Sequence, residues 1–369
     1  MRPVQTLGAR YDPRRNGYDL IRLGLACLVV TWHSFPLAGT DVDASSSVVV
    51  GFLETTLDLF FAISGFLVLA SWERLPRVGR HLEARFLRMF PGFWVCLVVT
   101  GFVVAPLGAW IAGTDPTAVF SGPHSAWAYV AANATTHMSF FDVAGTPTGV
   151  PLDGAWNGTL WSLQWETFCY LMVVTLGVLG LWRHRRAVLA LAAVVLAAFL
   201  VARTWGSPGL WLETQTLRFV SHFLLGSVVY LYRDRLPVGR WWVAGAAALS
   251  VVGLAVPAVS PLTAPALVYL LHTTAASLRH PRLRLRWDVS FGVFLYGYPV
   301  QQLLVLLGVG VGRPFLLLAA ALAVTLPLAW ASCVLVERPV REWPARRRAR
   351  RAETVLPVVL PAPATEIPR

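Results

Sequence analysis

The run Tyr18-Asp19-Leu20-Ile21-Arg22, followed by ten mostly apolar residues and then His33-Ser34-Phe35-Pro36, decides the fold. Arg22 and His33 are the only basic side chains in it. In a helix, eleven residues make three turns plus roughly 20°, so both lie on one face, roughly 16 Å apart along the axis. Charged residues inside a membrane span are costly and mark candidate functional sites. The alternative is an interfacial arginine and a hydrogen-bonded core histidine.

The composition is that of an integral membrane protein. Of 369 residues, 56% are hydrophobic and 14% are charged, whereas soluble domains carry about 25% charged residues. The net charge is +12 and every basic residue is an arginine. Most arginines lie in short runs between apolar stretches, as the positive-inside rule predicts, so the charge does not indicate nucleic-acid binding. Four cysteines lie in apolar stretches without metal-ligand spacing, which predicts free thiols and no metal site.

The apolar pattern predicts an all-α polytopic membrane protein with about ten transmembrane helices. The predicted spans are 18–38, 48–71, 89–112, 159–182, 187–204, 215–232, 241–257, 262–278, 288–311 and 314–337. The Arg-rich loops alternate along the chain and fall on one side, which places both termini in the cytoplasm.

Three regions follow from this topology. Residues 1–17 form a cytoplasmic arm, 18–340 the transmembrane domain, and 341–369 a basic and then Pro/Ala-rich cytoplasmic tail. Within the transmembrane domain, 113–158 is an extracytoplasmic loop that lacks arginine, and its aromatic residues predict that it folds onto the membrane surface.

Polar side chains in separate spans fall at comparable predicted depths. Asp58 and Glu166 could lie near His33, with Glu54 one turn before Asp58. A carboxylate beside an imidazole orients it and raises its basicity, as a general base requires. Arg85 and Arg88 lie three residues apart at the inner end of a span and would suit a phosphate-bearing ligand, although the positive-inside rule alone also predicts arginines there.

Other polar or small residues receive structural interpretations. His222 and His272 lie in spans, but neither has a matching arginine of the kind that Arg22 provides for His33, and both are interpreted as structural. Ser64-Gly65 lacks the context of a hydrolase elbow and indicates close helix packing or a kink instead.

Several motifs together resemble the integral-membrane acyltransferase family 3, the bacterial O-acyltransferases. They occur in the family's order over about 18–340: Arg22 with His33, the run 58–67, Arg85-Phe86-Leu87-Arg88-Met89-Phe90-Pro91, Trp161-Ser162-Leu163 with Glu166 and Tyr170, and Glu337-Arg338-Pro339. One departure is Gly297, which follows the run from Ser290 at a position where the family often has a histidine.

The resemblance implies transfer of an acyl group, most often acetyl, from acyl-coenzyme A to a hydroxyl of a saccharide, glycoconjugate or natural product. His33 would be the general base and Glu166 or Asp58 would orient it. The coenzyme's phosphates would bind Arg85 and Arg88, and Arg22 would line the path between the sites or contact the thioester arm.

The resemblance also implies substrate contacts from Trp161 and Ser162. No tightly bound cofactor is implied, and the location would be a bacterial inner membrane. The sequence leaves a homodimer open. It also leaves two other functions open: a proton-coupled transporter or flippase of a lipid-linked saccharide, and a non-catalytic scaffold.

Overall fold

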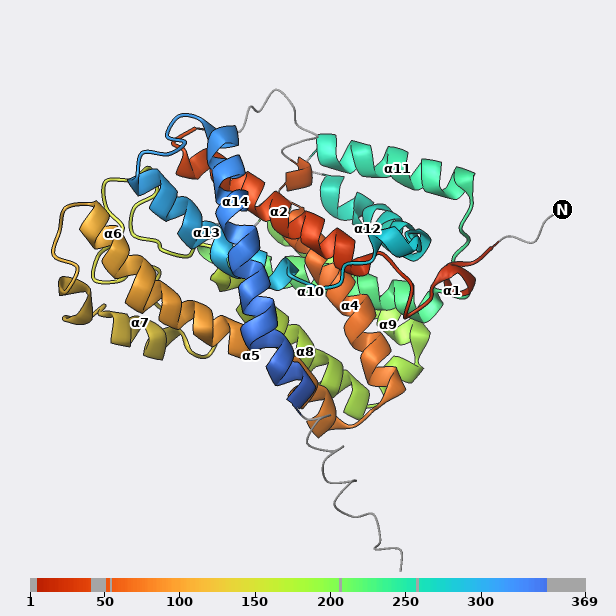
Figure 1. The fold of residues 1–369 in the computed structure, drawn as a ribbon. Coiled ribbons are helices and arrows are strands. Elements are labelled where there is room, and N and C mark those ends of the chain that lie inside the picture. Colours follow the sequence, from red (N-terminus) through yellow and green to blue (C-terminus); the bar gives the residue numbers. More distant parts are fainter. Residues whose placement is uncertain (1–4, 41–50, 54, 206–207, 257–258, 344–369) are drawn as a thin grey trace, which may run out of the picture.

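The structure is a computed structural model that describes residues 5–40, 51–53, 55–205, 208–256 and 259–343 (Figure 1). Within these ranges the chain is all-helical. Its longer helices are α2 Tyr18–Leu37, α4 Thr56–Arg74, α5 Val78–Val99, α6 Ala105–Ile111, α7 Ala126–Asn133, α8 Leu163–Val178, α9 Arg185–Trp205, α10 Trp211–Tyr232, α11 Arg240–Ala255, α12 Ser260–Ser277, α13 Ser290–Leu306 and α14 Pro314–Ser332. Five-residue π-helical turns, Thr100–Val104 and Cys333–Glu337, join α5 to α6 and extend α14.

Each of the ten predicted spans coincides with a helix. Among the described residues, five helical stretches are long and apolar enough to cross a membrane: Tyr18–Leu37, Gly51–Arg74, Val78–Ile111, Arg185–Trp205 and Pro314–Trp343. For the other five, crossing stays a prediction, as does the cytoplasmic location of the termini. Glu54 and most of the predicted tail lie outside the described residues.

The predicted spans 48–71 and 89–112 left 72–88 as a loop between them, and this was wrong for most of that length. Helix α4 continues to Arg74 and α5 begins at Val78, so a short connection separates them. The charged residues of 78–88 concealed the helix because apolar runs alone defined the spans. The charged first turns of α5 place Arg85 and Arg88 on a rigid element, three residues apart.

Two segments predicted to lie outside the spans, the N-terminal arm and the loop 113–158, are folded against the helices. In the N-terminal arm, the amide of Leu7 donates to the carbonyl of Leu236 (2.9 Å) and that of Gly8 to the carbonyl of Arg233 (2.8 Å). The loop 113–158 contains α7 and buries Tyr129 and Trp156. It is anchored to α13 through Gln302, whose Nε2 donates to the carbonyls of Leu152 and Ala155 at 2.8 and 2.9 Å.

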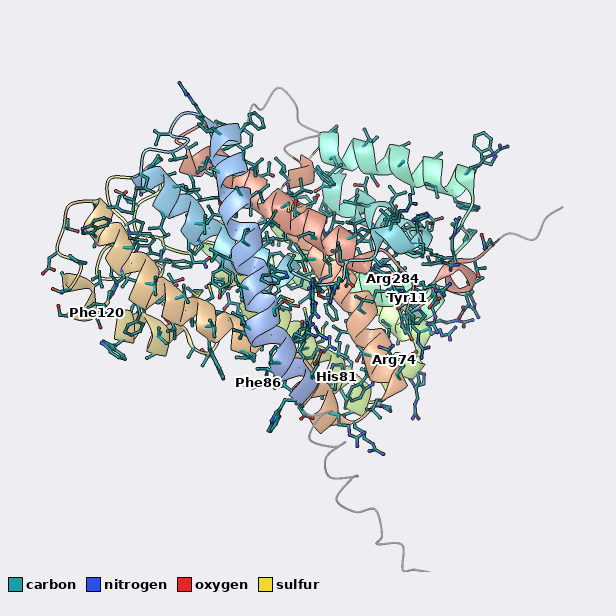
Figure 2. All side chains as sticks on the ribbon, in the orientation of Figure 1. Tyr11, Arg74, His81, Phe86, Phe120 and Arg284 are labelled. Atoms are coloured by element: carbon teal, nitrogen blue, oxygen red, sulfur yellow. The ribbon has the colours of Figure 1, made fainter. Side chains whose placement is uncertain are left out.

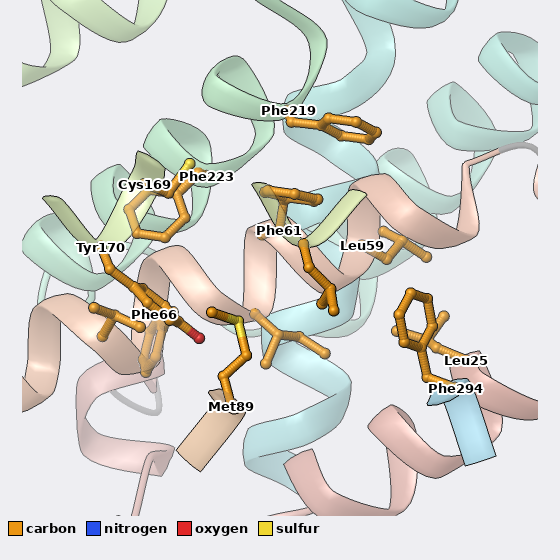
Figure 3. Packing of buried hydrophobic residues seen from close by; sticks show 14 of the residues in the cluster. Leu25, Leu59, Phe61, Phe66, Met89, Cys169, Tyr170, Phe219, Phe223 and Phe294 are labelled. Carbon is orange, nitrogen blue, oxygen red and sulfur yellow. The ribbon is translucent and has the colours of Figure 1, made fainter. Parts of the chain in front are cut away.

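The centre of the bundle is the crossing of α4 and α10, where two glycines allow the backbones to approach. A Cβ on Gly65 would lie 1.9 Å from the carbonyl oxygen of Phe223, and one on Gly226 would lie 2.0 Å from that of Ala62. The Ser227 hydroxyl also donates to the carbonyl of Gly65 (3.2 Å). This confirms that Ser64-Gly65 marks close helix packing. Figure 3 shows the aromatic and aliphatic side chains packed around the crossing.

Substituting alanine at Gly65 should therefore destabilise the protein by about 2 kcal/mol, because a methyl group there overlaps a carbonyl of α10. Thermal unfolding of the detergent-solubilised protein would measure this. Gly245→Ala is the matched control, since a Cβ on Gly245 has nothing within 4 Å, and it should be neutral or slightly stabilising. Equal melting temperatures for the two variants would contradict the tight crossing.

Candidate active site

Three cavities lie in series through the bundle, and neighbouring cavities share lining residues. We name them the basic cavity, the apolar passage and the His33 cavity. Arg22, Ser64 and Glu166 line both the basic cavity and the apolar passage. Leu57 and Phe294 line both the apolar passage and the His33 cavity. The shared residues place the three cavities next to one another along α2, and we call this row of cavities the path.

The basic cavity has a volume of about 330 Å³ and is walled by guanidinium groups. Its arginines come from the N-terminal arm, α2, α4, α5 and the segment before α13: Arg14, Arg22, Arg74, Arg85, Arg88 and Arg284. Figure 2 labels three residues of its wall, Tyr11, Arg74 and Arg284. Burial raises the pKa of the Tyr11 phenol, which therefore stays protonated and can donate a hydrogen bond.

Asp288 holds two of these arginines in place. Its Oδ2 accepts from Nη1 of Arg22 at 2.8 Å and from Nη2 of Arg88 at 3.0 Å. Its Oδ1 accepts from the Ser290 hydroxyl at 2.6 Å. The carboxylate thus joins α2, α5 and the start of α13, with only 13% of its side chain exposed. The sequence analysis missed Asp288, although its signal is an acidic residue directly after four arginines at a predicted span entrance.

Arg85 is placed differently from its neighbour Arg88. Its guanidinium lies 5.8 Å from the centroid of the Tyr170 ring. Its Nε is buried and has no hydrogen-bond partner within the described part of the chain. Buried donors are normally satisfied, so this wall of the cavity offers a charged donor to an anionic ligand.

The apolar passage is narrow, with a volume of about 50 Å³. Its apolar lining comes from Leu57, Phe60, Phe61, Leu163, Phe291 and Phe294, and the polar residues Arg22, Ser64, Ser162, Glu166 and Ser290 also line it. Phe61 stacks on Phe219 at 4.3 Å between ring centroids, which fixes one side of the passage (Figure 3). Such a passage admits a thin, weakly polar chain but not a bulky charged group.

The His33 cavity has a volume of about 430 Å³ and lies at the far end of the path. His33 Nδ1 is 2.8 Å from the carbonyl oxygen of Val29. A carbonyl only accepts, so Nδ1 carries the hydrogen and the lone pair of the neutral ring is on Nε2. The ring packs edge-on against Tyr298, with centroids 5.2 Å apart. Trp161 and Trp32 present aromatic surface to the same cavity.

Neither predicted carboxylate orients His33. Glu166 accepts from the Tyr170 hydroxyl and, at 3.5 Å, from the Ser64 hydroxyl, at the junction of the basic cavity and the apolar passage. Asp58 pairs with Nε of Arg218 at 2.7 Å. The error has a physical cause, because depth in a span says nothing about which way a side chain faces. The carbonyl of Val29 does the orienting instead.

The remaining histidines and Gly297 have packing explanations. His272 Nδ1 lies 2.7 Å from the Tyr18 hydroxyl and links α12 to α2, as a structural role predicts. His222 Nδ1 bonds the carbonyl of Arg218 at 2.8 Å and lies 3.8 Å from Asp58. A Cβ on Gly297 would lie 2.7 Å from Val30 Cγ2, so a histidine there would collide with α2.

Comparison with known proteins now decides the family. Residues 15–334 match the family described as "Acyltransferase domain". The chain belongs to this family. It is therefore an acyltransferase enzyme. It is 28% identical over 367 residues to "Nodulation protein 10" of Rhizobium leguminosarum bv. viciae, covering 91% of this chain and 96% of that protein.

A second relative carries an activity in its name. The acyltransferase is 24% identical over 307 residues to the "O-acetyl transferase" of Shigella phage Sf6, covering 79% of this chain and 86% of that protein. No solved structure matches.

Replacing Asp288 with alanine should cost about 3 kcal/mol of folding free energy, because Arg22 and Arg88 are then left without their shared carboxylate. The control is Asp234→Ala, which removes an exposed carboxylate 4.0 Å from Arg233 and should cost less than about 1 kcal/mol. Both are measured by thermal unfolding in the same detergent. A neutral Asp288 variant would show that the pairing does not hold these helices together.

Proposed function

We propose that this acyltransferase moves an acyl group, most often acetyl, from acyl-coenzyme A to a hydroxyl of a saccharide, glycoconjugate or natural product. The observation that carries the proposal is the row of three adjoining cavities, which runs from Arg85, whose Nε has no hydrogen-bond partner among the described residues, to the cavity that His33 lines. The name of the phage relative supports O-acyl transfer in particular. The enzyme would work in a bacterial inner membrane, with its basic cavity open to the cytoplasm.

The chemistry of coenzyme A fits the three parts of the path in turn. Its phosphates would lie in the basic cavity, where Arg85 offers a free donor and Arg74 and Arg284 lie on the wall. Its pantetheine arm is thin and uncharged, as the apolar passage requires. The thioester would then emerge beside His33, roughly 16 Å along α2 from Arg22.

The reaction proposed at His33 is a proton-coupled acyl transfer. Nε2 of His33 takes the proton from the acceptor hydroxyl as that oxygen attacks the thioester carbonyl carbon. The tetrahedral intermediate collapses, the carbon–sulfur bond breaks, and the coenzyme A sulfur takes the proton from the imidazolium. Products are the ester and the free thiol. The Val29 carbonyl keeps Nδ1 protonated, so Nε2 is the nitrogen that accepts the proton and later releases it.

Two variants, His33→Gln and Arg85→Gln, should distinguish acetyl-coenzyme A binding from acetyl transfer. His33→Gln should bind acetyl-coenzyme A with unchanged affinity and lose transfer by about 10²- to 10⁴-fold, as loss of a general base does. Equilibrium binding and product formation with radiolabelled acetyl-coenzyme A measure the two. Transfer at the wild-type rate would exclude His33 as the base.

Arg85→Gln should weaken acetyl-coenzyme A binding by about 10- to 100-fold, the effect of removing a charged hydrogen bond to a phosphate. Arg80→Gln is the matched control, because Arg80 lies on the same helix, is exposed, and does not line the cavity. Equal affinities for the two variants would place the phosphates elsewhere.

A further inference from the structure

Few arginines lie on the predicted outer side, and two of them line the cavity that contains His33. Of 31 arginines, the predicted topology places only Arg203, Arg218 and Arg313 toward that side. Arg203 and Arg218 come from α9 and α10, and both line the His33 cavity. The positive-inside rule does not account for arginines at this end, so their convergence on the acceptor side of the path needs another explanation.

The two guanidiniums have different surroundings. Arg218 pairs with Asp58 at 2.7 Å, and its side chain is 19% exposed. Arg203 is exposed and has no hydrogen bond or ion pair with any residue in the described ranges. A second, adjoining cavity on the other side of α4 is lined by the same two arginines together with Asp58 and His222. Arg218 is thus held by Asp58, while the charge of Arg203 is available at the boundary of the two cavities.

We propose that the acceptor is an anionic saccharide whose carboxylate or phosphate group binds Arg203, while its sugar ring lies on the Trp161 and Trp32 side of the His33 cavity. This proposal rests on the acyl transfer proposed above and adds the charge of the substrate. A guanidinium recognises carboxylates and phosphates through paired hydrogen bonds, and aromatic faces provide the apolar surface that ligand cavities use. Bound this way, the acceptor presents its hydroxyl groups to Nε2 of His33.

The experiment uses the full chain in neutral-lipid nanodiscs with radiolabelled acetyl-coenzyme A. Three probes serve as acceptors: methyl glucoside, methyl glucuronide and glucose 1-phosphate. We expect kcat/KM for at least one anionic probe to exceed that for methyl glucoside by about tenfold, and Arg203→Gln to abolish this preference. Acetyl-coenzyme A affinity and the rate with methyl glucoside should not change. Arg203→Lys should retain part of the preference, and the exposed Arg313→Gln all of it.

Three results would overturn the proposal. The first is a wild type that shows no preference for either anionic probe, and the second is a preference that survives in Arg203→Gln. In the third, phosphatidylglycerol nanodiscs raise the melting temperature of the wild type but not of Arg203→Gln, while the acceptor preference of the two proteins is the same; this would assign Arg203 to a lipid headgroup. A wild type that does not bind acetyl-coenzyme A would instead contradict the proposed function itself.

Discussion

The carboxylate of Asp288 is the contact on which the geometry of the path depends. It binds Arg22 and Arg88 at once, and so fixes α2 against α5 and the start of α13 beside the basic cavity, which both arginines line. Because α2 is a continuous helix, fixing Arg22 also fixes His33 three turns further along. One ion-paired cluster therefore determines where the path begins, and one helix determines where it ends.

The structure separates Glu166 from His33, two side chains that the sequence had placed in one cluster. Glu166 with Tyr170 and Arg85 belongs to the basic cavity, and His33 with Trp161 belongs to the opposite one. A narrow apolar stretch lies between them. This arrangement suits a reaction in which the donor's charged portion and the acceptor never share a cavity, and only the uncharged arm of the donor passes between.

Much of the fold could be predicted from the sequence, because the spacing of apolar and small residues indicates where the helices lie and which faces they pack. The positions of the helices, the common face of Arg85 and Arg88, and the close packing at Gly65 follow from periodicity and residue size. The partners of Asp58, Glu166 and Asp288 did not follow, since they depend on how α2, α4, α8 and α10 rotate about their axes. Gly297 also needed the structure, which shows Val30 occupying the space that a side chain would fill.

The most direct test is an experimental structure of the protein with a non-hydrolysable acetyl-coenzyme A analogue. The account predicts phosphates at Arg85, the pantetheine arm between Phe60 and Phe294, and the acetyl group in the cavity that contains His33. An acetyl group that stops beside Glu166, with the apolar passage empty, would contradict the account and move the reaction to the basic cavity.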